Sequence, residues 1–317
     1  MTVGTASGKI ILFGEHAVVY GRPALAVPLS QMRARAEIRA RTERGIVIHA
    51  LDLKREIELD ELPQDDPLAT ITQLTLNKLS ATGNLEISVQ SDIPMESGFG
   101  SGAAISTAIV RGLAAYFGTR LTPAEISELV YQTEKMYHGT PSGIDNTVIA
   151  YEQPIRFVAF TERSNLSTGA NEITPFSIAK PFTLVIANTG IASPTKITVG
   201  DVRRGWLQDP VRYEEIFDAI GAIVQEAQDA LARGENGRLG ELMTRNQLEL
   251  EKIGVSSDEI EKLIEVGLQA GAKGGKLSGG GRGGNVIFYV EGEGAEDVKR
   301  AVVEACAVGT IVTRVGN

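Results

Sequence analysis

The pattern of apolar and polar positions predicts strands in the first third of the chain. The run Lys9–Phe13 is apolar after its first residue, which is typical of a buried strand. Alternating apolar and polar residues predict antiparallel strands at Met32–Arg41, Ile46–Ala50 and Glu56–Leu59. A further strand at Leu85–Gln90 leads into a glycine-rich loop.

Apolar residues at helical spacing predict helices in both halves of the chain. Thr122 and Pro123 give one helix a threonine cap and a proline at its first position. The predicted helices are Pro67–Ala81, Ser101–Phe117, Pro123–Tyr137, Thr195–Trp206, Val211–Arg233, Arg238–Ile253, Asp258–Ala270 and Glu296–Ala305. The other predicted strands are Ile155–Phe160, Phe182–Ala187, Ala272–Leu277, Val286–Val290 and Thr310–Val315.

The order of these elements predicts two domains. A length of 317 residues suits two cores. Strands interleaved with helices after Pro181 indicate an α+β sandwich of the ferredoxin-like type. We therefore expect domains at residues 1–180 and 181–317.

Composition narrows the class of protein. Hydrophobic residues make up 43% and charged residues 22%, as in soluble globular proteins. The net charge of −9 argues against a nucleic-acid partner, and the arginines of Arg33–Arg41 are interpreted as the solvated face of a strand. Cys306 is the single cysteine, which excludes an intramolecular disulfide and a cysteine-based zinc site. The N-terminal residues show no signal-peptide pattern, and no apolar run approaches the length of a bilayer span, so we expect no membrane association and a cytoplasmic location.

The stretch Pro94–Ser106 is the first candidate site. Gly98, Gly100 and Gly102 fall within five residues and lead directly into a predicted helix. Glycine permits positive φ and close backbone approach, and a helix N-terminus attracts anions, so the loop suits a phosphate. The alternative is a tight loop with a helix cap, because the stretch matches neither the Walker A nor the Rossmann pattern.

Two acidic residues form the second candidate site. Glu134 lies on the last turn of a predicted helix, and Asp145 follows a Gly-Thr-Pro-Ser-Gly turn. Phosphoryl transfer uses such a pair, with one carboxylate to hold magnesium and one to accept a hydroxyl proton. The alternative is a solvated Glu134 and an Asp145 that caps the next segment.

A third glycine run covers Gly274–Gly284. So many glycines suggest backbone that lies against a ligand or another part of the protein. Arg282 in this run is either a phosphate contact or a solvated loop tip. His49 lies in an alternating strand and is interpreted as structural, and no His, Cys and Asp spacing indicates a transition-metal site.

These runs resemble, in order and spacing, the three motifs of the GHMP kinase superfamily, which includes galacto-, homoserine, mevalonate and phosphomevalonate kinases. Within it the chain looks like the mevalonate kinases, on the segments Lys9–Gly21 and Glu134–Asn146. Asn246-Gln247 and Asn188-Thr189-Gly190 add support, and the resemblance spans nearly the whole chain.

The resemblance implies an N-terminal domain like domain 2 of ribosomal protein S5, a ferredoxin-like C-terminal domain and an active site in the cleft between them. Asp145 matches the catalytic base and Lys9 the lysine that pairs with it. Glu134 matches a magnesium ligand, with Ser101 as a second candidate, and Glu15, His16 and Thr195 match residues that hold mevalonate. ATP would bind Pro94, Glu96, Ser97, Gly98, Phe99, Gly100, Ser101, Gly102, Ala103, Ala104 and Arg282.

Two positions depart from the family pattern. The family's phosphate-binding loop has a magnesium-coordinating serine where this chain has Gly102. The family's separate C-terminal glycine loop has a glycine where this chain has Arg282. A water can replace the serine oxygen, or Ser101 or Ser106 can supply one.

The resemblance implies ATP- and Mg²⁺-dependent phosphorylation of the 5-hydroxyl of mevalonate, a step of isoprenoid biosynthesis. One alternative is another GHMP kinase, such as phosphomevalonate kinase, which extra basic residues at the substrate site would favour. Another is a non-catalytic relative that binds ATP, although the chain keeps Lys9, Glu134 and Asp145 together. The assembly state stays open, with a homodimer as one option.

Overall fold

The structure is a computed structural model that describes residues 1–59, 66–94, 98–138, 142–161, 166, 170–192 and 195–316. The chain divides into two compact units, which are residues 1–9 with 28–153 (unit 1) and residues 10–27 with 154–317 (unit 2). Strands β1 (Thr2–Phe13) and β2 (Pro23–Ala40) each have one end in each unit. The predicted boundary between domains at residues 180 and 181 stays a prediction.

Unit 1 contains strands in the order β4-β3-β5-β2. Strand β5 (Leu85–Ser91) pairs antiparallel with β2, and β3 (Ile46–Ala50) pairs antiparallel with β4 (Arg55–Glu58). As predicted, β3 runs in the opposite direction to both β2 and β4. The order was not predicted: β5 lies between β2 and β3 and runs parallel to β3.

The alternation along β2 predicted its two faces correctly. Ala36 and Ile38 are fully buried, whereas Arg35 and Arg39 are exposed and form ion pairs with Glu37. The arginine-rich stretch is therefore a solvated strand face, as predicted. The strand begins at Pro23, nine residues before the predicted start, because the apolar run ahead of Met32 hides the alternation.

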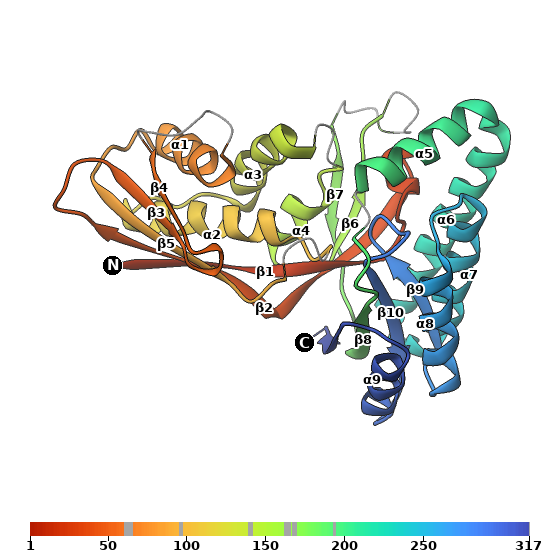
Figure 1. The fold of residues 1–317 in the computed structure, drawn as a ribbon. Helices are drawn as coiled ribbons and strands as arrows, with labels where there is room; N and C mark the ends of the chain where they lie inside the picture. Colours follow the sequence, from red (N-terminus) through yellow and green to blue (C-terminus); the bar gives the residue numbers. More distant parts are fainter. Residues whose placement is uncertain are drawn as a thin grey trace. The chain divides into compact units, whose positions relative to one another are not determined.

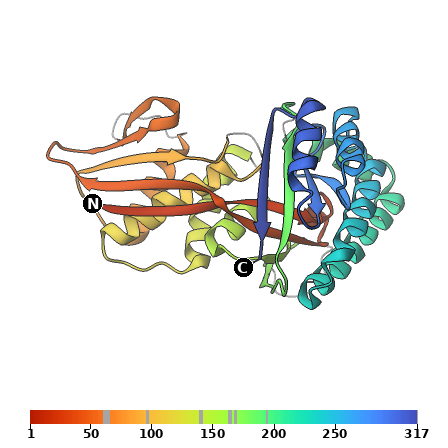
Figure 2. The ribbon, with the colours of Figure 1, turned by 90° about the horizontal axis from the view of Figure 1, so that it is seen from below.

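Helices α1 to α4 cover one face of the unit 1 strands (Figures 1 and 2). Helix α3 begins with a capping box in which the backbone N–H of Glu125 donates to Thr122 Oγ1 and the Glu125 carboxylate accepts from the backbone N–H of Thr122. Helix α4 was not predicted, since eight residues are too few for a clear helical period. The bounds are α1 Pro67–Leu79, α2 Ser101–Tyr116, α3 Pro123–His138 and α4 Ile144–Tyr151.

Unit 2 contains a four-stranded antiparallel sheet in the order β11-β8-β10-β9. Four helices, α5 to α8, lie between β8 and β9 in the chain, and α9 lies between β10 and β11. This is the β-α-β-β-α-β order of a ferredoxin-like domain, so that prediction is confirmed. The bounds are β8 Phe182–Asn188, α5 Thr195–Gln208, α6 Pro210–Arg233, α7 Leu239–Lys252, α8 Asp258–Gln269, β9 Gly274–Ser278, β10 Asn285–Val290, α9 Ala295–Glu304 and β11 Gly309–Val315.

Two short strands and three 3-10 turns complete the described elements. Strand β6 pairs with the start of β2 and with β7, which the weak sequence pattern did not predict. Across the described residues, none of the helices combines the length and the apolar character needed to span a membrane. The bounds are η1 Ala17–Tyr20, η2 Leu51–Leu53, β6 Ile155–Val158, β7 Glu172–Pro175 and η4 Asn236–Arg238.

Candidate functional site

The centre of the candidate site in unit 1 is an ion pair between Lys9 and Asp145. Lys9 Nζ lies 2.9 Å from Asp145 Oδ1. The lysine side chain is 4% exposed, whereas the aspartate side chain is 35% exposed. One carboxylate is thus held by a buried cation and remains accessible from outside, as a group that accepts a proton from a bound molecule must be.

The position of Asp145 on helix α4 is fixed by the two residues that follow it, Asn146 and Thr147. Asn146 and Thr147 are buried and face helix α3, where Asn146 Nδ2 donates to the carbonyl and the hydroxyl of Ser127. Thr147 Oγ1 donates to the carbonyl of Gly143, which begins the helix with a φ of 87°. Because the residues after Asp145 are buried and hydrogen-bonded, the helix has little freedom to rotate, and its first-turn carboxylate points away from the core.

The glycine-rich loop is tied to the same strand that carries Lys9. The backbone N–H of Lys9 donates to the carbonyl of Phe99 over 2.9 Å. Gly100 has a φ of 75°, and a methyl group on its Cα would lie 2.8 Å from Ile149 Cδ1 and 3.3 Å from Lys9 Cγ. The position therefore requires glycine for two independent reasons, positive φ and contact with the stem of the lysine.

The loop ends at the N-terminus of α2, which carries no side-chain cap. The first-turn amides of a helix lack intrahelical acceptors and attract an anion. Ser101 Oγ donates to the carbonyl of Ile93 over 3.2 Å. Gly98 has a φ of 77°, Pro94 is exposed, and Ala103 and Ala104 are buried. The predicted ATP contacts Glu96 and Ser97 lie outside the described residues.

Glu134 and Gly102 lie next to each other. A methyl group on Gly102 would be 3.5 Å from Glu134 Oε1, and no other described atom outside its own helix backbone would come within 4 Å. Within the part of the chain that the structure describes, His, Cys, Asp and Glu side chains form no group of three that could hold a metal ion. A single carboxylate beside open space still fits Mg²⁺, which commonly binds one or two carboxylates and keeps several waters.

A second set of predicted residues meets in unit 2, around Gly280. His16 Nε2 lies 3.0 Å from the Gly280 carbonyl, and a methyl group on Gly280 would lie 2.9 Å from Thr195 Oγ1. Glu15 is 1% exposed and forms an ion pair with Lys276, whose side chain is fully buried. His16 and Thr195, from two distant parts of the sequence, thus both lie beside Gly280, and Glu15 precedes His16 in the chain. That these three residues bind a substrate stays a prediction.

The pKa of His16 is lowered from 6.5 to about 4, mainly by burial. The hydrogen bond to Gly280 opposes this shift, and the positive charges of Arg282 and Lys276 add to it. The imidazole is neutral at neutral pH. Since a carbonyl can only accept, Nε2 carries the proton, and Nδ1 is left as an acceptor for a hydroxyl or amide donor.

Arg282 is not a free loop tip, because its side chain and its backbone both bond to neighbouring segments. Its Nε donates to the Gly254 carbonyl over 2.9 Å, its backbone N–H donates to the Val255 carbonyl over 2.7 Å, and its Nη1 pairs with Asp201 on α5. This hydrogen bond lowers the pKa of Asp201 below its ordinary value. Arg282 therefore fastens the glycine run to α5 and to the turn after α7, and its phosphate role stays a prediction.

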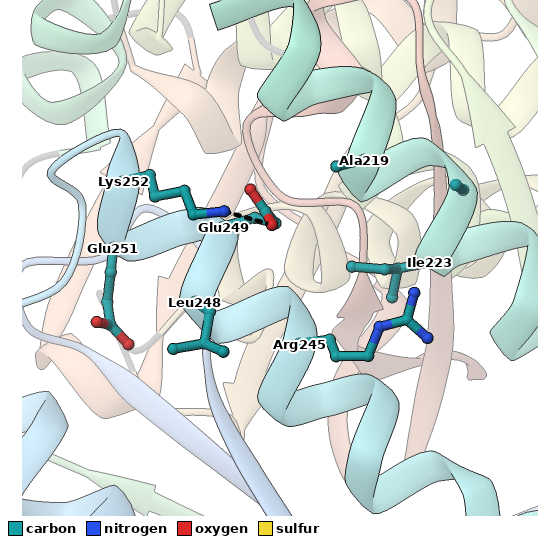
Figure 3. A pocket seen from close by; sticks show the side chains of 8 residues that line it. Ala219, Ile223, Arg245, Leu248, Glu249, Glu251 and Lys252 are labelled. Atoms are coloured by element: carbon teal, nitrogen blue, oxygen red, sulfur yellow. Dashed lines mark hydrogen bonds and ion pairs between the residues drawn. The ribbon is translucent and has the colours of Figure 1, made fainter. Parts of the chain in front are cut away.

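A groove elsewhere in unit 2 contains none of the predicted site residues. It has a volume of about 580 Å³ and lies between α6 and α7, where Ile223 and Leu248 line it and Lys252 pairs with Glu249 over 2.7 Å (Figure 3). In this pair the lysine is the more exposed partner, whereas in the Lys9–Asp145 pair the carboxylate is the more exposed one. Its remaining lining residues are Ala219, Ala222, Arg245 and Glu251.

The ion pair between Lys276 and Glu15 was not predicted from the sequence, where Lys276 was considered only as part of a glycine run. The signal was present: one lysine in the otherwise small and apolar run Gly274–Ser278 must find a carboxylate if the strand is buried. The other missed contact is Asp201, a helix residue that nothing in the sequence connects to Arg282.

Comparisons with known proteins identify the family of this chain. Residues 68–153 match the family described as GHMP kinases N terminal domain, and residues 227–308 match GHMP kinases C terminal. The mevalonate kinase of Pyrococcus furiosus is 32% identical over 89% of this chain and 87% of its own length. The mevalonate kinase of Archaeoglobus fulgidus is 33% identical over 92% of this chain and 93% of its own.

Among solved structures, L. major mevalonate kinase in complex with R-mevalonate superposes with a TM-score of 0.82 at 29% identity, covering 100% of this chain and 96% of that one. Both family domains, relatives above 30% identity over nine-tenths of the chain, and a whole-chain structural match thus agree. The chain belongs to the GHMP kinases and, within them, to the mevalonate kinase family.

Proposed function

We propose that this chain transfers the γ-phosphoryl group of ATP to the 5-hydroxyl of mevalonate, giving 5-phosphomevalonate and ADP. The observation that carries the proposal is the Lys9–Asp145 pair beside Gly100, because it joins an accessible carboxylate, a buried cation and a glycine loop within one compact unit. The family to which the chain belongs supplies the substrate class.

Asp145 is proposed as the base. As the 5-hydroxyl oxygen bonds to the γ-phosphorus, the bond from that phosphorus to the bridging oxygen of ADP breaks, and the hydroxyl proton passes to Asp145. Lys9 keeps the carboxylate in place over 2.9 Å and places a positive charge beside the reacting oxygen. Phosphoryl transfer depends mostly on positioning, so a buried lysine on a strand is a suitable holder.

ATP is proposed to lie with its phosphates on the loop from Pro94 to Gly100 and on the first turn of α2, from Ser101 to Ala104. The uncapped helix N-terminus supports this placement. Mg²⁺ would be held mainly by Glu134 and would neutralise charge on the phosphates. Ser101 is a second candidate for that ion, since its hydroxyl donates its hydrogen to the Ile93 carbonyl and keeps its oxygen lone pairs.

Mevalonate is proposed to bind Glu15, His16 and Thr195. Both cations that act on His16, namely Lys276 and Arg282, already have carboxylate partners. A phosphorylated substrate would need positive charge that is not already neutralised, so this part of unit 2 favours a substrate with hydroxyls and one carboxylate over phosphomevalonate.

The test is a substrate panel with Mg-ATP, containing mevalonate, phosphomevalonate, homoserine and galactose, with the product identified by ³¹P NMR. Mevalonate should give the highest kcat/KM and a 5-phosphate product. Faster turnover of phosphomevalonate would identify the other mevalonate-pathway kinase, and ATP binding without turnover of any alcohol would identify a non-catalytic relative. A cytoplasmic location and a homodimer are part of the same proposal, and size-exclusion chromatography with light scattering tests the second.

A further inference from the structure

Among the ion pairs of the residues that the structure describes, the one between Glu15 and Lys276 is the most completely buried. The glutamate side chain is 1% exposed and the lysine side chain 0%. Lys276 Nζ also donates to the Leu277 carbonyl over 2.5 Å. Moving two charges out of water costs more free energy than a well-packed apolar pair would, so stability alone does not explain the arrangement.

Lys276 lies on a strand that is hydrogen-bonded on several sides. It lies on β9, opposite Ile287 of the central strand β10. The Leu277 backbone N–H donates to Gln247 Oε1 on α7 over 2.9 Å, which fastens the residue after the lysine to a helix. Ser278 Oγ donates to the Ile11 carbonyl over 2.8 Å, so β9 is also joined to the segment that leads to Glu15.

The segment that carries Glu15 is held on its other side as well. The Gly14 backbone N–H donates to Asn246 Oδ1 over 3.4 Å, and His16 donates from Nε2 to the Gly280 carbonyl. His16 has a φ of 59°, an uncommon conformation for a residue other than glycine that persists only where the surroundings impose it. The backbone at Glu15 is therefore fixed before any substrate arrives, and its side chain needs an equally fixed partner.

We propose that Lys276 is a positioning residue that holds the Glu15 carboxylate, charged and in one orientation, for binding mevalonate. The proposal rests on the proposed function in one respect, namely that Glu15 binds the substrate. Burial lowers the pKa of Lys276 while Glu15 raises it, which fits a lysine whose charge depends on its partner. Lys276 itself touches neither substrate nor ATP and acts through Glu15.

A double-mutant cycle of Lys276→Met and Glu15→Gln tests this inference. Loss of a hydrogen bond to a charged group predicts that Lys276→Met raises the KM for mevalonate by about 10- to 100-fold while the KM for ATP changes by less than about threefold. In the Glu15→Gln background, Lys276→Met should change the KM for mevalonate by less than about threefold, because its effect is transmitted by the glutamate.

Lys252→Met is the control, since the Lys252 side chain is 52% exposed and pairs with Glu249 of the same helix over 2.7 Å. It should leave both KM values within about twofold of wild type, as exposed pairs contribute little. If Lys276→Met does not fold, the comparison of Glu15→Gln with the double variant decides, because neither variant contains an unpaired buried carboxylate. A double variant with a KM for mevalonate ten times that of Glu15→Gln would overturn the proposal, and so would a folded Lys276→Met with a normal KM.

Failure of the proposed function gives a different result. If wild-type protein does not phosphorylate mevalonate, the proposed function falls, and the same cycle is then measured with the alcohol that the protein does use. The thermal midpoint is followed in parallel: Lys276→Met alone should lower it by about 5 °C or more, and the double variant should recover part of that loss. Additive losses would show that the two side chains do not act as a pair.

Discussion

Lys9–Asp145 in unit 1 and Lys276–Glu15 in unit 2 are both lysine–carboxylate pairs, and the exposure of the carboxylate separates them. Asp145 is 35% exposed and Glu15 is 1% exposed, although both lysines are buried. A carboxylate that remains accessible can take a proton from a molecule that approaches it. A carboxylate enclosed with its lysine is fixed in place, and its contribution lies in orientation. On this difference rests our proposal that the first pair serves the reaction and the second positions a side chain.

The largest effect should come from removing the accessible carboxylate. Asp145→Asn keeps the shape of the side chain but removes the base, so kcat should fall by about 100- to 10,000-fold while ATP still binds. Steady-state kinetics and calorimetric ATP titration measure the two quantities. Asp218→Asn is the control, because Asp218 is 71% exposed and pairs with Arg22 on the surface. If the kcat of Asp145→Asn is within about threefold of the wild-type value, Asp145 is not the base, and Lys9 becomes the main candidate for activating the hydroxyl.

Lowering the pH should reduce the free energy of unfolding through protonation of His16. Its pKa in the folded protein is about 4, below the unfolded value of 6.5. Between these values the unfolded chain binds a proton that the folded protein does not, so the free energy of unfolding falls as pH falls through that window. The loss amounts to about 3 kcal/mol and is complete near pH 4.

The measurement is denaturant unfolding of wild type and His16→Asn from pH 8 to pH 4. Asparagine tolerates the positive φ at this position better than most residues. The difference in unfolding free energy between the two proteins should be constant above pH 7 and should shrink or reverse in sign below pH 6.5. A difference that stays constant down to pH 4.5 would show that His16 is not buried in its neutral form.

Magnesium dependence tests the region near the accessible pair. Glu134→Gln should raise the magnesium concentration needed for half-maximal kcat by about tenfold, whereas Gly102→Ser should lower it by about two- to threefold, because serine adds an oxygen beside the carboxylate. Gly102 has room for a side chain and no positive φ. Ser101→Ala and Ser106→Ala are the comparison variants. If Glu134→Gln leaves the magnesium concentration for half-maximal kcat unchanged, Glu134 does not hold the ion and is a solvated helix residue. If either alanine variant raises that concentration strongly, the serine it replaces is a ligand of the ion.

The smallest effect should come from Arg282→Gly, which restores the residue found in the family. The change removes hydrogen bonds to Asp201 and Gly254 but relieves a φ of 55°, so the two contributions should nearly cancel, within about 1 kcal/mol. The KM for ATP should change by less than about threefold. A tenfold rise in that KM would show that Arg282 leaves Asp201 and binds phosphate.

The sequence alone determined most elements and the family. Local patterns are sufficient for that purpose: the alternation in β2, the capping box at Thr122 and the β-α-β-β-α-β order of unit 2 each depend on residues close together in the chain. The sequence also singled out Lys9 and Asp145, through motifs that the resemblance interprets. The resemblance also implies that these two side chains pair, and the structure confirms the pairing.

Only the tertiary structure decided which charges pair and how far each is exposed. Lys276 is 261 residues from Glu15, and Asp201 is 81 residues from Arg282. Residues that far apart share no local pattern, and the alternatives considered for Arg282 did not include its actual partner. The parallel pairing of β3 with β5 was missed for the same reason, because strand order depends on which distant strand fills the space. Whether a side chain is buried and which charge it pairs with depend on its neighbours in the folded protein, and those neighbours come from distant parts of the sequence.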